Sequence, residues 1–177
     1  TCPRTIISIE KKSMIEVSSL HVYPVKSLQG IALDAATLGI RGLKYDRNWV
    51  VTDSNFRFLT QREIPDLASI GVRLSSDGLV LEHQSISPLS LEFETGTSAH
   101  QGVTIWNDSC PSVDQGDAVS DWLTEVVGAW KGNALKLFRF QDDHERTVDR
   151  TYLRGEKSHT AFADGFPFLI SSEESLA

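Results

Sequence analysis

The sequence predicts a mainly β protein: a closed or partly open β-barrel with one packed amphipathic helix, plus the truncated start of a second β-rich domain. Short runs of β-forming residues recur at intervals of about 8–12 residues through the first two-thirds of the chain, a spacing typical of sandwiches and barrels. One later stretch has apolar residues at helical spacing. We favour a barrel because closure removes exposed strand edges.

The first strands are expected in four runs rich in β-formers: 17–25, 31–38, 48–52 and 56–60. Pro24 places the end of the first strand at an edge or bulge, since proline cannot donate to a ladder. Trp49 and Val51 lie two residues apart and therefore share one face of their strand. The turn signal Asp53-Ser54-Asn55 predicts that the last two runs form a hairpin.

The clearest hairpin follows. Ile70, Val72 and Leu74 alternate with polar or small residues, and the returning strand is expected at 79–82. Between them Ser76-Asp77-Gly78 is a turn in which the glycine can take a positive φ. Two further strands are expected at 89–93 and 103–106.

The helix is predicted from a single apolar stripe. Its members stand at helical spacing and are Val119, Trp122, Leu123, Val126, Val127 and Trp130. Asp117 is the expected N-cap, and Gly128 or Gly132 ends the helix. The stripe should pack on the barrel, with its tryptophans in the core.

The C-terminal part changes character. A strand is expected at 135–140, a charged surface loop or linker at 141–159, and a short strand at 168–170. Ser171 and Glu174 have capping-box spacing, which predicts a helix start near Glu173. An isolated helical turn is unstable, so we expect the natural protein to continue. The predicted organisation is a disordered or vector-derived arm (1–14), a barrel domain (15–134) and the start of a second domain (135–177).

Composition narrows the function classes. The formal net charge of −7 argues against nucleic-acid binding, which needs a basic surface. No run approaches the roughly 20 apolar residues of a transmembrane helix, and no secretory signal opens the chain. The two cysteines, Cys2 and Cys110, do not make a disulfide framework, which favours a reducing, cytoplasmic setting. Cys110 is interpreted as a free thiol in a loop.

Three local groups carry donors for an oxygen-rich anion: Tyr23 to Ser27, Asp46 to Trp49, and Thr60 to Glu63. Arginine offers a bidentate fork, lysine a mobile point charge, and serine a hydroxyl. If the fold brings these strand ends together, they form a small positive cradle. Taken singly, each of these cations is more often an ordinary solvated surface residue than part of a binding site. His144 among Asp142, Asp143 and Glu145 is interpreted as a solvated charge run, not a metal site.

Four ordered motifs resemble those of the MOSC family. They are Tyr23-Pro24-Val25-Lys26-Ser27 with Gly30; Gly39 to Gly42 with Asp46-Arg47-Asn48-Trp49; Phe58 to Glu63 with Pro65 and Leu67; and Phe162 to Ile170 with Ser172, Glu173 and Ser175-Leu176. Val103 to Trp106, Asp108, Gly116 and the helix fit the end of the same N-terminal β-barrel domain. The fourth motif looks like the start of the MOSC domain proper.

The resemblance implies binding of the molybdenum cofactor, molybdopterin. By that resemblance Lys26, Ser27 and Arg47 contact the phosphate and pterin, while Asp164, Gly165 and Phe166 form a loop that also reaches the cofactor. Some relatives carry small polar residues where this chain has Gly165 and Phe166, so only backbone contacts are expected there. The family's molybdenum-binding cysteine lies downstream of the fourth motif, beyond Ala177. No metal ligand or catalytic residue is assigned, and this chain alone is not expected to be active.

Two functions follow from the resemblance. The first is the N-terminal part of an oxidoreductase that reduces N-hydroxylated small molecules with electrons from an iron–sulfur or flavin partner, the redox chemistry belonging to the cofactor. The alternative is a non-catalytic cofactor-carrier, sulfur-carrier or partner-docking module. Pyridoxal phosphate binding is a further expectation drawn from the family. An unrelated β-barrel is the third interpretation.

Overall fold

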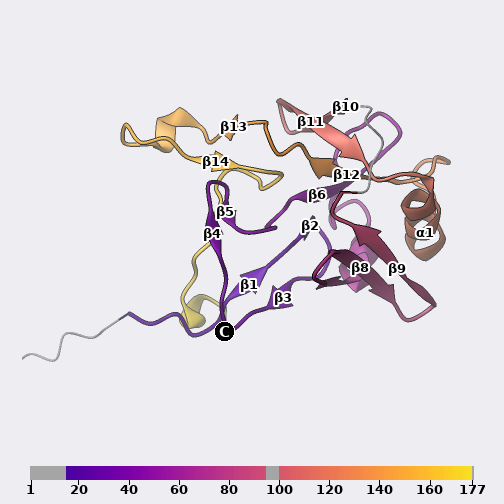
Figure 1. The fold of residues 1–177 in the computed structure, drawn as a ribbon, viewed down its shortest axis with the longest axis horizontal. Coiled ribbons are helices and arrows are strands. Elements are labelled where there is room, and N and C mark those ends of the chain that lie inside the picture. Colours follow the sequence, from indigo (N-terminus) through magenta and orange to yellow (C-terminus); the bar gives the residue numbers. More distant parts are fainter. Residues whose placement is uncertain (1–14, 95–99, 177) are drawn as a thin grey trace, which may run out of the picture.

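The structure, a computed structural model, describes residues 15–94 and 100–176; the predicted arm, 1–14, lies outside the described residues. The described chain is mainly β with one α-helix, as predicted (Figure 1). The strands are β1 (His21–Val22), β2 (Val25–Lys26), β3 (Ile31–Ala32), β4 (Leu38–Gly39), β5 (Gly42–Leu43), β6 (Trp49–Thr52), β7 (Gly71–Leu74), β8 (Gly78–His83), β9 (Ile86–Glu92), β10 (His100–Ile105), β11 (Asp108–Asp114), β12 (Lys136–Phe140), β13 (Arg146–Thr147) and β14 (His159–Thr160). The helices are α1 (Asp117–Val127) and the 3-10 turns η1 (Pro65–Ser69), η2 (Arg150–Tyr152) and η3 (Glu173–Ser175).

The main sheet has five strands in the order β10-β11-β12-β6-β2. Its neighbours are antiparallel except β2 and β6, which run parallel with Val25 opposite Trp49 and Lys26 opposite Val50. All four residues of β6 are buried, so this strand has core on both faces. The predicted boundary at 134/135 directly precedes β12, an inner strand of this sheet, and the division into domains stays a prediction.

A three-stranded antiparallel sheet, β7-β8-β9, contains the predicted hairpin, with Leu74 opposite Leu79. Gly78 is not among the described glycines with positive φ, so that part of the prediction is wrong. Glycine is required here because there is no room for a side chain: an added Cβ would lie 1.9 Å from the Leu91 carbonyl oxygen.

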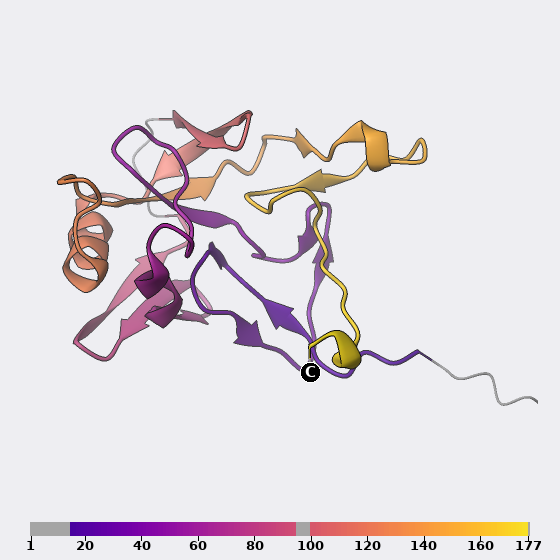
Figure 2. The same ribbon diagram turned by 180° about the vertical axis from the view of Figure 1, so that it is seen from behind.

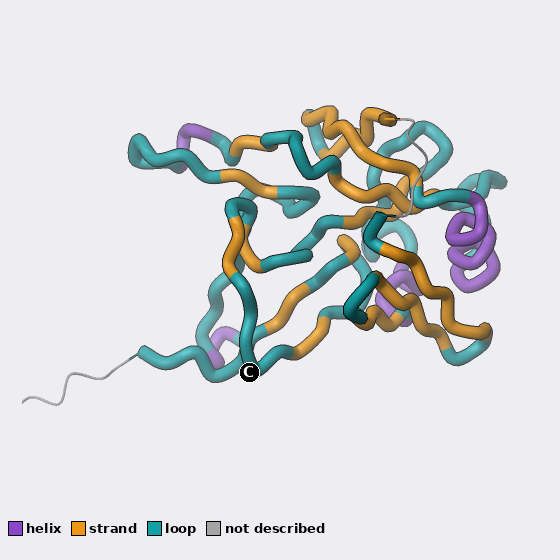
Figure 3. Tube along the Cα trace, in the orientation of Figure 1, coloured by secondary structure: helices purple, strands orange, loops and turns teal. Residues whose placement is uncertain are grey.

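The sheets do not close into a barrel within residues 15–94 and 100–176. The main sheet ends at β10 and β2, and the remaining pairs, β1-β3, β4-β5 and β13-β14, are separate. The prediction named a closed or a partly open barrel. The closed barrel is wrong, and the open arrangement of sheets agrees with the second alternative. The two-residue strands β1 to β5 give ladders too short to join the sheets, and Figure 3 shows these strands as short pieces between longer loops. Residues 56–60 likewise make only isolated bridges, through Arg57 and Phe58, and no extended hairpin strand.

Two apolar clusters lie on opposite faces of β6. The larger contains Trp49 and Val51 and extends to the three-stranded sheet and α1; the smaller contains Val50. Figure 2 shows α1 at one end of the molecule, beside β8 and β9. The helix packs through the predicted stripe, with Val119, Trp122 and Leu123 buried. Burying such a stripe is the main stabilisation available to a short helix.

Several boundary predictions are wrong. The N-cap of α1 is Gly116 at φ 95°, and Asp117 is the first helical residue; Gly128 ends the helix as predicted. Residues 168–170 form no strand, because they lie exposed without a partner segment to complete a ladder. The predicted helix near Glu173 is a three-residue 3-10 turn capped by Ser172, whose side chain makes no capping bond.

Cys110 is also placed differently from the prediction. It is a free thiol, as expected, but it lies fully buried in β11 instead of in a loop. Within the described part of the chain, no helix has both the length and the apolar character needed to cross a membrane.

Candidate anion-binding site

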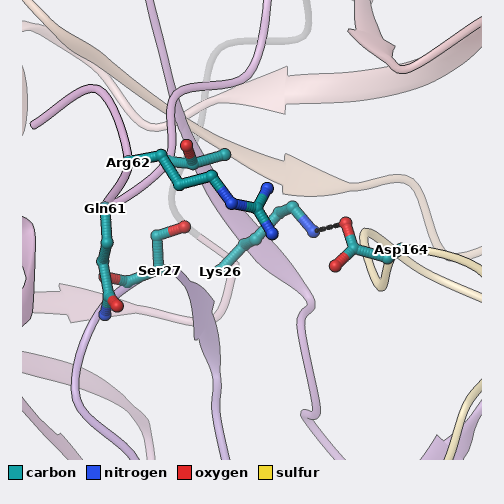
Figure 4. Close-up of a pocket in the computed structure, with 6 residues that line it drawn as sticks. Lys26, Ser27, Gln61, Arg62 and Asp164 are labelled. Atoms are coloured by element: carbon teal, nitrogen blue, oxygen red, sulfur yellow. Dashed lines mark hydrogen bonds and ion pairs between the residues drawn. The ribbon is translucent and has the colours of Figure 1, made fainter.

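A pocket of about 160 Å³ joins two of the three donor groups found in the sequence (Figure 4). Its walls are Lys26, Ser27, Thr60, Gln61, Arg62 and Asp164. Lys26 and Ser27 come from the end of β2, the next three from the loop before η1, and Asp164 from the loop after β14. Segments separated by most of the chain thus meet in one small polar cavity.

Lys26 forms the inner wall of the pocket. Only 8% of its side chain is exposed, and its Nζ donates a 2.7 Å bond to Asp164 Oδ1. The ammonium lies 5.5 Å from the centroid of the Phe58 ring, a cation–π contact. Burial lowers the pKa of Lys26 below its usual range, and the charges of Arg47 and Arg146 act in the same direction, whereas Asp164 opposes them.

Ser27 turns the chain out of β2. Its φ of 71° is a left-handed conformation that few residues other than glycine adopt. Leu28 then donates its N–H back to the Val25 carbonyl oxygen, closing the turn. The Gln61 amide donates a 2.9 Å bond to the Ser27 carbonyl oxygen, which ties the two donor loops together.

The second loop is held in shape by Glu63. Its Oε2 accepts from the Thr60 backbone N–H at 3.2 Å, and its Oε1 accepts from Arg57 at 2.7 Å. The Glu63 N–H in turn donates to the Thr60 carbonyl oxygen. This tight turn presents Arg62 at the mouth, and Figure 4 shows its side chain converging with Lys26 from a different segment.

Arg47 lies beside the pocket and is not part of its wall. Its backbone N–H donates to the Tyr23 carbonyl oxygen at 2.7 Å, so it stands next to the strand that carries Lys26. Its guanidinium pairs with the buried Asp46 carboxylate and stacks 5.1 Å from the Tyr23 ring centroid. The two cations therefore lie on neighbouring segments, close enough for Arg47 to affect the pKa of Lys26.

Asp164 is the acidic wall of the pocket. Its Oδ1 accepts from Lys26 and, at 3.1 Å, from the Trp106 indole N–H. Partial burial disfavours the charged form, but Lys26, the Trp106 bond and the charge of Arg62 outweigh it and hold the pKa of Asp164 below its usual range.

The other two predicted loop residues do not line the pocket. Phe166 is 44% exposed and packs edge-to-face with Tyr152. Gly165 has open space where a side chain would be. The structure thus places Lys26, Ser27 and Asp164 together, Arg47 beside them, and Gly165 and Phe166 further along the loop.

Arg146 is the residue that sequence reasoning missed most completely. It lies in the charged stretch 141–159, which we predicted to be a surface loop, yet only 7% of its side chain is exposed. It donates to the carbonyl oxygens of Ala161 and Ala163, at 2.8 and 2.6 Å, and to Asp108 Oδ2 at 2.8 Å. No periodicity distinguishes it from the exposed charges around it. Two other residues of the site were also not predicted individually. Arg62 lies in the donor group Thr60 to Glu63, and Trp106 ends a predicted strand.

Residues 14–130, about two-thirds of the chain, match the family described as the MOSC N-terminal beta barrel domain. The chain belongs to this family. The family was expected from the four ordered motifs, and the match confirms it. In this MOSC chain the first and third of those motifs both contribute walls of the pocket.

The proteins to which the chain is similar include amidoxime-reducing components and molybdenum cofactor sulfurases. The MOSC chain is 30% identical over 168 residues to the human mitochondrial amidoxime-reducing component 1, covering 91% of this chain and 49% of that protein. It is 32% identical over 145 residues to the molybdenum cofactor sulfurase of Drosophila grimshawi, covering 78% of this chain and 18% of the sulfurase. It therefore spans about half the length of the first relative and a fifth of the second.

A solution structure from Bordetella bronchiseptica aligns with 63% of this chain and 92% of its own at TM-score 0.47 and 18% identity.

Proposed function

We propose that this MOSC chain is the N-terminal part of a molybdenum-cofactor-binding oxidoreductase that reduces N-hydroxylated substrates, and that its pocket grips the cofactor's phosphate. The observation that carries the proposal is the buried ammonium of Lys26, which shares a pocket with Ser27 and Arg62. The ammonium is paired with the Asp164 carboxylate, whose side chain is 67% exposed, and the Ser27 hydroxyl and the Arg62 fork offer an anionic ligand further donors in the same cavity.

The size of the pocket supports a phosphate. Its volume is about 160 Å³. Pockets that enclose a whole drug-sized ligand measure about 300–1,000 Å³. The cavity therefore suits a phosphate group and not an entire pterin, whose remainder needs residues outside it.

The donor chemistry supports the same ligand. Lys26 supplies a point charge, Arg62 a planar fork and Ser27 a hydroxyl, the three donor types that bind multi-oxygen anions. Arg47 adds positive potential beside the pocket. When bound, the cofactor supplies the redox chemistry; the residues of this chain bind and orient it. Gly165 and Phe166 stay predicted backbone contacts, and an electron-transfer partner and a cytoplasmic location stay predictions.

The test is titration of this chain with inorganic phosphate, followed by NMR. Lys26→Met keeps the buried stem and removes the charge, so we expect at least about a tenfold weaker Kd, the equivalent of about 1.4 kcal/mol. Arg62→Ala should weaken it by about three- to tenfold for loss of a charged hydrogen bond. Arg73→Ala, a cation on β7 paired with Glu82, is the control and should leave the Kd unchanged. Equal Kd values for Lys26→Met and the unaltered chain would refute the site.

A second function is favoured by one observation, the 32% identity to a molybdenum cofactor sulfurase. In that case the same pocket belongs to a cofactor-carrier or sulfur-transfer module. The full-length natural protein distinguishes the two: amidoxime reduction with an added electron donor supports the oxidoreductase, and sulfur transfer without reduction supports the module. Pyridoxal phosphate carries the same phosphate group, so its Kd should be measured beside that of molybdopterin.

A further inference from the structure

The anion pocket already contains an anion of its own. The Asp164 carboxylate lies 2.7 Å from the Lys26 ammonium, on the wall of the same cavity. The two side chains are unequally exposed, 8% for Lys26 and 67% for Asp164. The ammonium is thus held in place by its surroundings, whereas the carboxylate stands at the open rim.

We propose that Asp164 is a displaceable internal anion, which occupies the Lys26 ammonium in the ligand-free protein and gives way to the incoming phosphate. The inference rests on the proposed function, because it concerns the same pocket. It assigns Asp164 the role of setting the affinity and charge selectivity of the site, in place of the direct cofactor contact that the family resemblance implies.

The contacts of Asp164 show what a phosphate gains by replacing it. The carboxylate accepts from Lys26 and Trp106 through one oxygen, Oδ1. Arg62 acts on it only through charge. A phosphate in the cavity can reach the ammonium together with the Ser27 hydroxyl and the Arg62 fork. More donors and a second negative charge therefore favour the phosphate over the carboxylate.

The backbone around Asp164 stays anchored while its side chain moves. Arg146 donates to the carbonyl oxygens of Ala161 and Ala163, three residues and one residue before Asp164, and to the carbonyl oxygen of Asp164 itself at 3.4 Å. The Asp164 side chain is 67% exposed. Its rotation from Lys26 toward solvent therefore requires no shift of the loop.

The internal anion has a consequence for selectivity. A monoanion such as acetate only exchanges one carboxylate for another at Lys26 and gains little. A dianion such as phosphate brings additional charge to Lys26 and Arg62. The wild-type pocket should therefore discriminate phosphate from acetate, and removing the Asp164 charge should reduce that discrimination.

The decisive variant is Asp164→Asn, which keeps the size and the Trp106 acceptor and removes the charge. Its control is Asp142→Asn, an aspartate that is similarly exposed, at 71%, and similarly paired, 2.8 Å from Arg139. We expect Asp164→Asn to tighten the Kd for inorganic phosphate by about tenfold and that for acetate by more, and Asp142→Asn to change either by less than about twofold.

The Trp106 indole supplies a second readout that a general charge effect would not move. Its N–H loses the Asp164 acceptor when phosphate binds, so its NMR signal should shift in the wild type. The indoles of Trp49 and Trp122 donate to Gln115 and Ser87 and serve as internal references that should stay still.

An unchanged or weaker phosphate Kd in Asp164→Asn, while Lys26→Met still weakens binding, would overturn the displaceable anion and leave the phosphate site standing. A Trp106 signal that does not shift while phosphate saturates the site would also overturn the displaceable anion and leave the phosphate site standing. Absence of phosphate binding in the wild type and Asp164→Asn alike would overturn the proposed function, and this inference with it.

Discussion

The guanidinium of Arg146 donates a 2.6 Å hydrogen bond to the carbonyl oxygen of Ala163, one residue before Asp164. A second bond from the same Nη1 reaches the carbonyl oxygen of Ala161, and Nε pairs with Asp108. One buried side chain thus joins β13, the start of β11 and the loop that closes the pocket. Asp164 meets Lys26 across 138 residues of sequence because this loop is held in place.

Arg146→Ala should destabilise the protein by about 2–4 kcal/mol, because it leaves buried carbonyl groups without a donor at about 1–3 kcal/mol each. Urea unfolding measures the change. Arg150→Ala, an exposed arginine in η2, is the control and should stay within about 0.5 kcal/mol. Equal stabilities for the two variants would show that the Arg146 bonds do not hold the loop.

Anion affinity should fall as the pH rises toward the alkaline range. Burial lowers the pKa of Lys26, so its ammonium loses a proton below the ordinary value of 10.5, and the neutral amine no longer attracts phosphate. Phosphate titrations between about pH 8 and 9.5, where phosphate stays a dianion and an ordinary lysine stays charged, follow the loss. Lys26→Arg keeps its charge over this range and should show a flat profile. A flat profile in the wild type would contradict the lowered pKa.

Cys110 should be nearly inert in the folded protein. Burial raises the pKa of its thiol to about 11, and the thiolate is the reactive form. In a Cys2→Ser background at pH 8, iodoacetamide should react more than about 100-fold more slowly than with a free thiol of ordinary pKa near 8.5. Denaturant should restore the ordinary rate. Rapid labelling of the native protein would mean that β11 opens readily.

Gly78→Ala should destabilise the three-stranded sheet. The new Cβ would stand 1.9 Å from the Leu91 carbonyl oxygen, so the β8–β9 ladder must shift, at a cost of about 2–3 kcal/mol. Gly39→Ala is the matched control, since its nearest atom is 3.8 Å away. Thermal unfolding should separate the two variants by several degrees. Similar Tm values would show that the sheet absorbs the methyl group without strain.

The local sequence pattern was sufficient to predict a helix or strand where burial of one face places apolar residues at regular intervals. The β7–β8 hairpin and α1 follow directly from their apolar spacing. Trp49 and Val51 share the larger apolar cluster, as alternation required. The same reasoning failed for 168–170, because an apolar run forms a strand only where a partner strand completes its ladder.

The sequence by itself determined the mainly β class, the family and the candidate residues for an anion site, since those depend on composition, order and local spacing. The tertiary structure alone decided which of them meet. It placed Arg62 in the pocket and Arg47 beside it, and it buried Arg146, although all three look alike in sequence. The physical reason is that the desolvation and pairing of a charge depend on segments that the fold brings together. Local periodicity does not show which distant segments become neighbours.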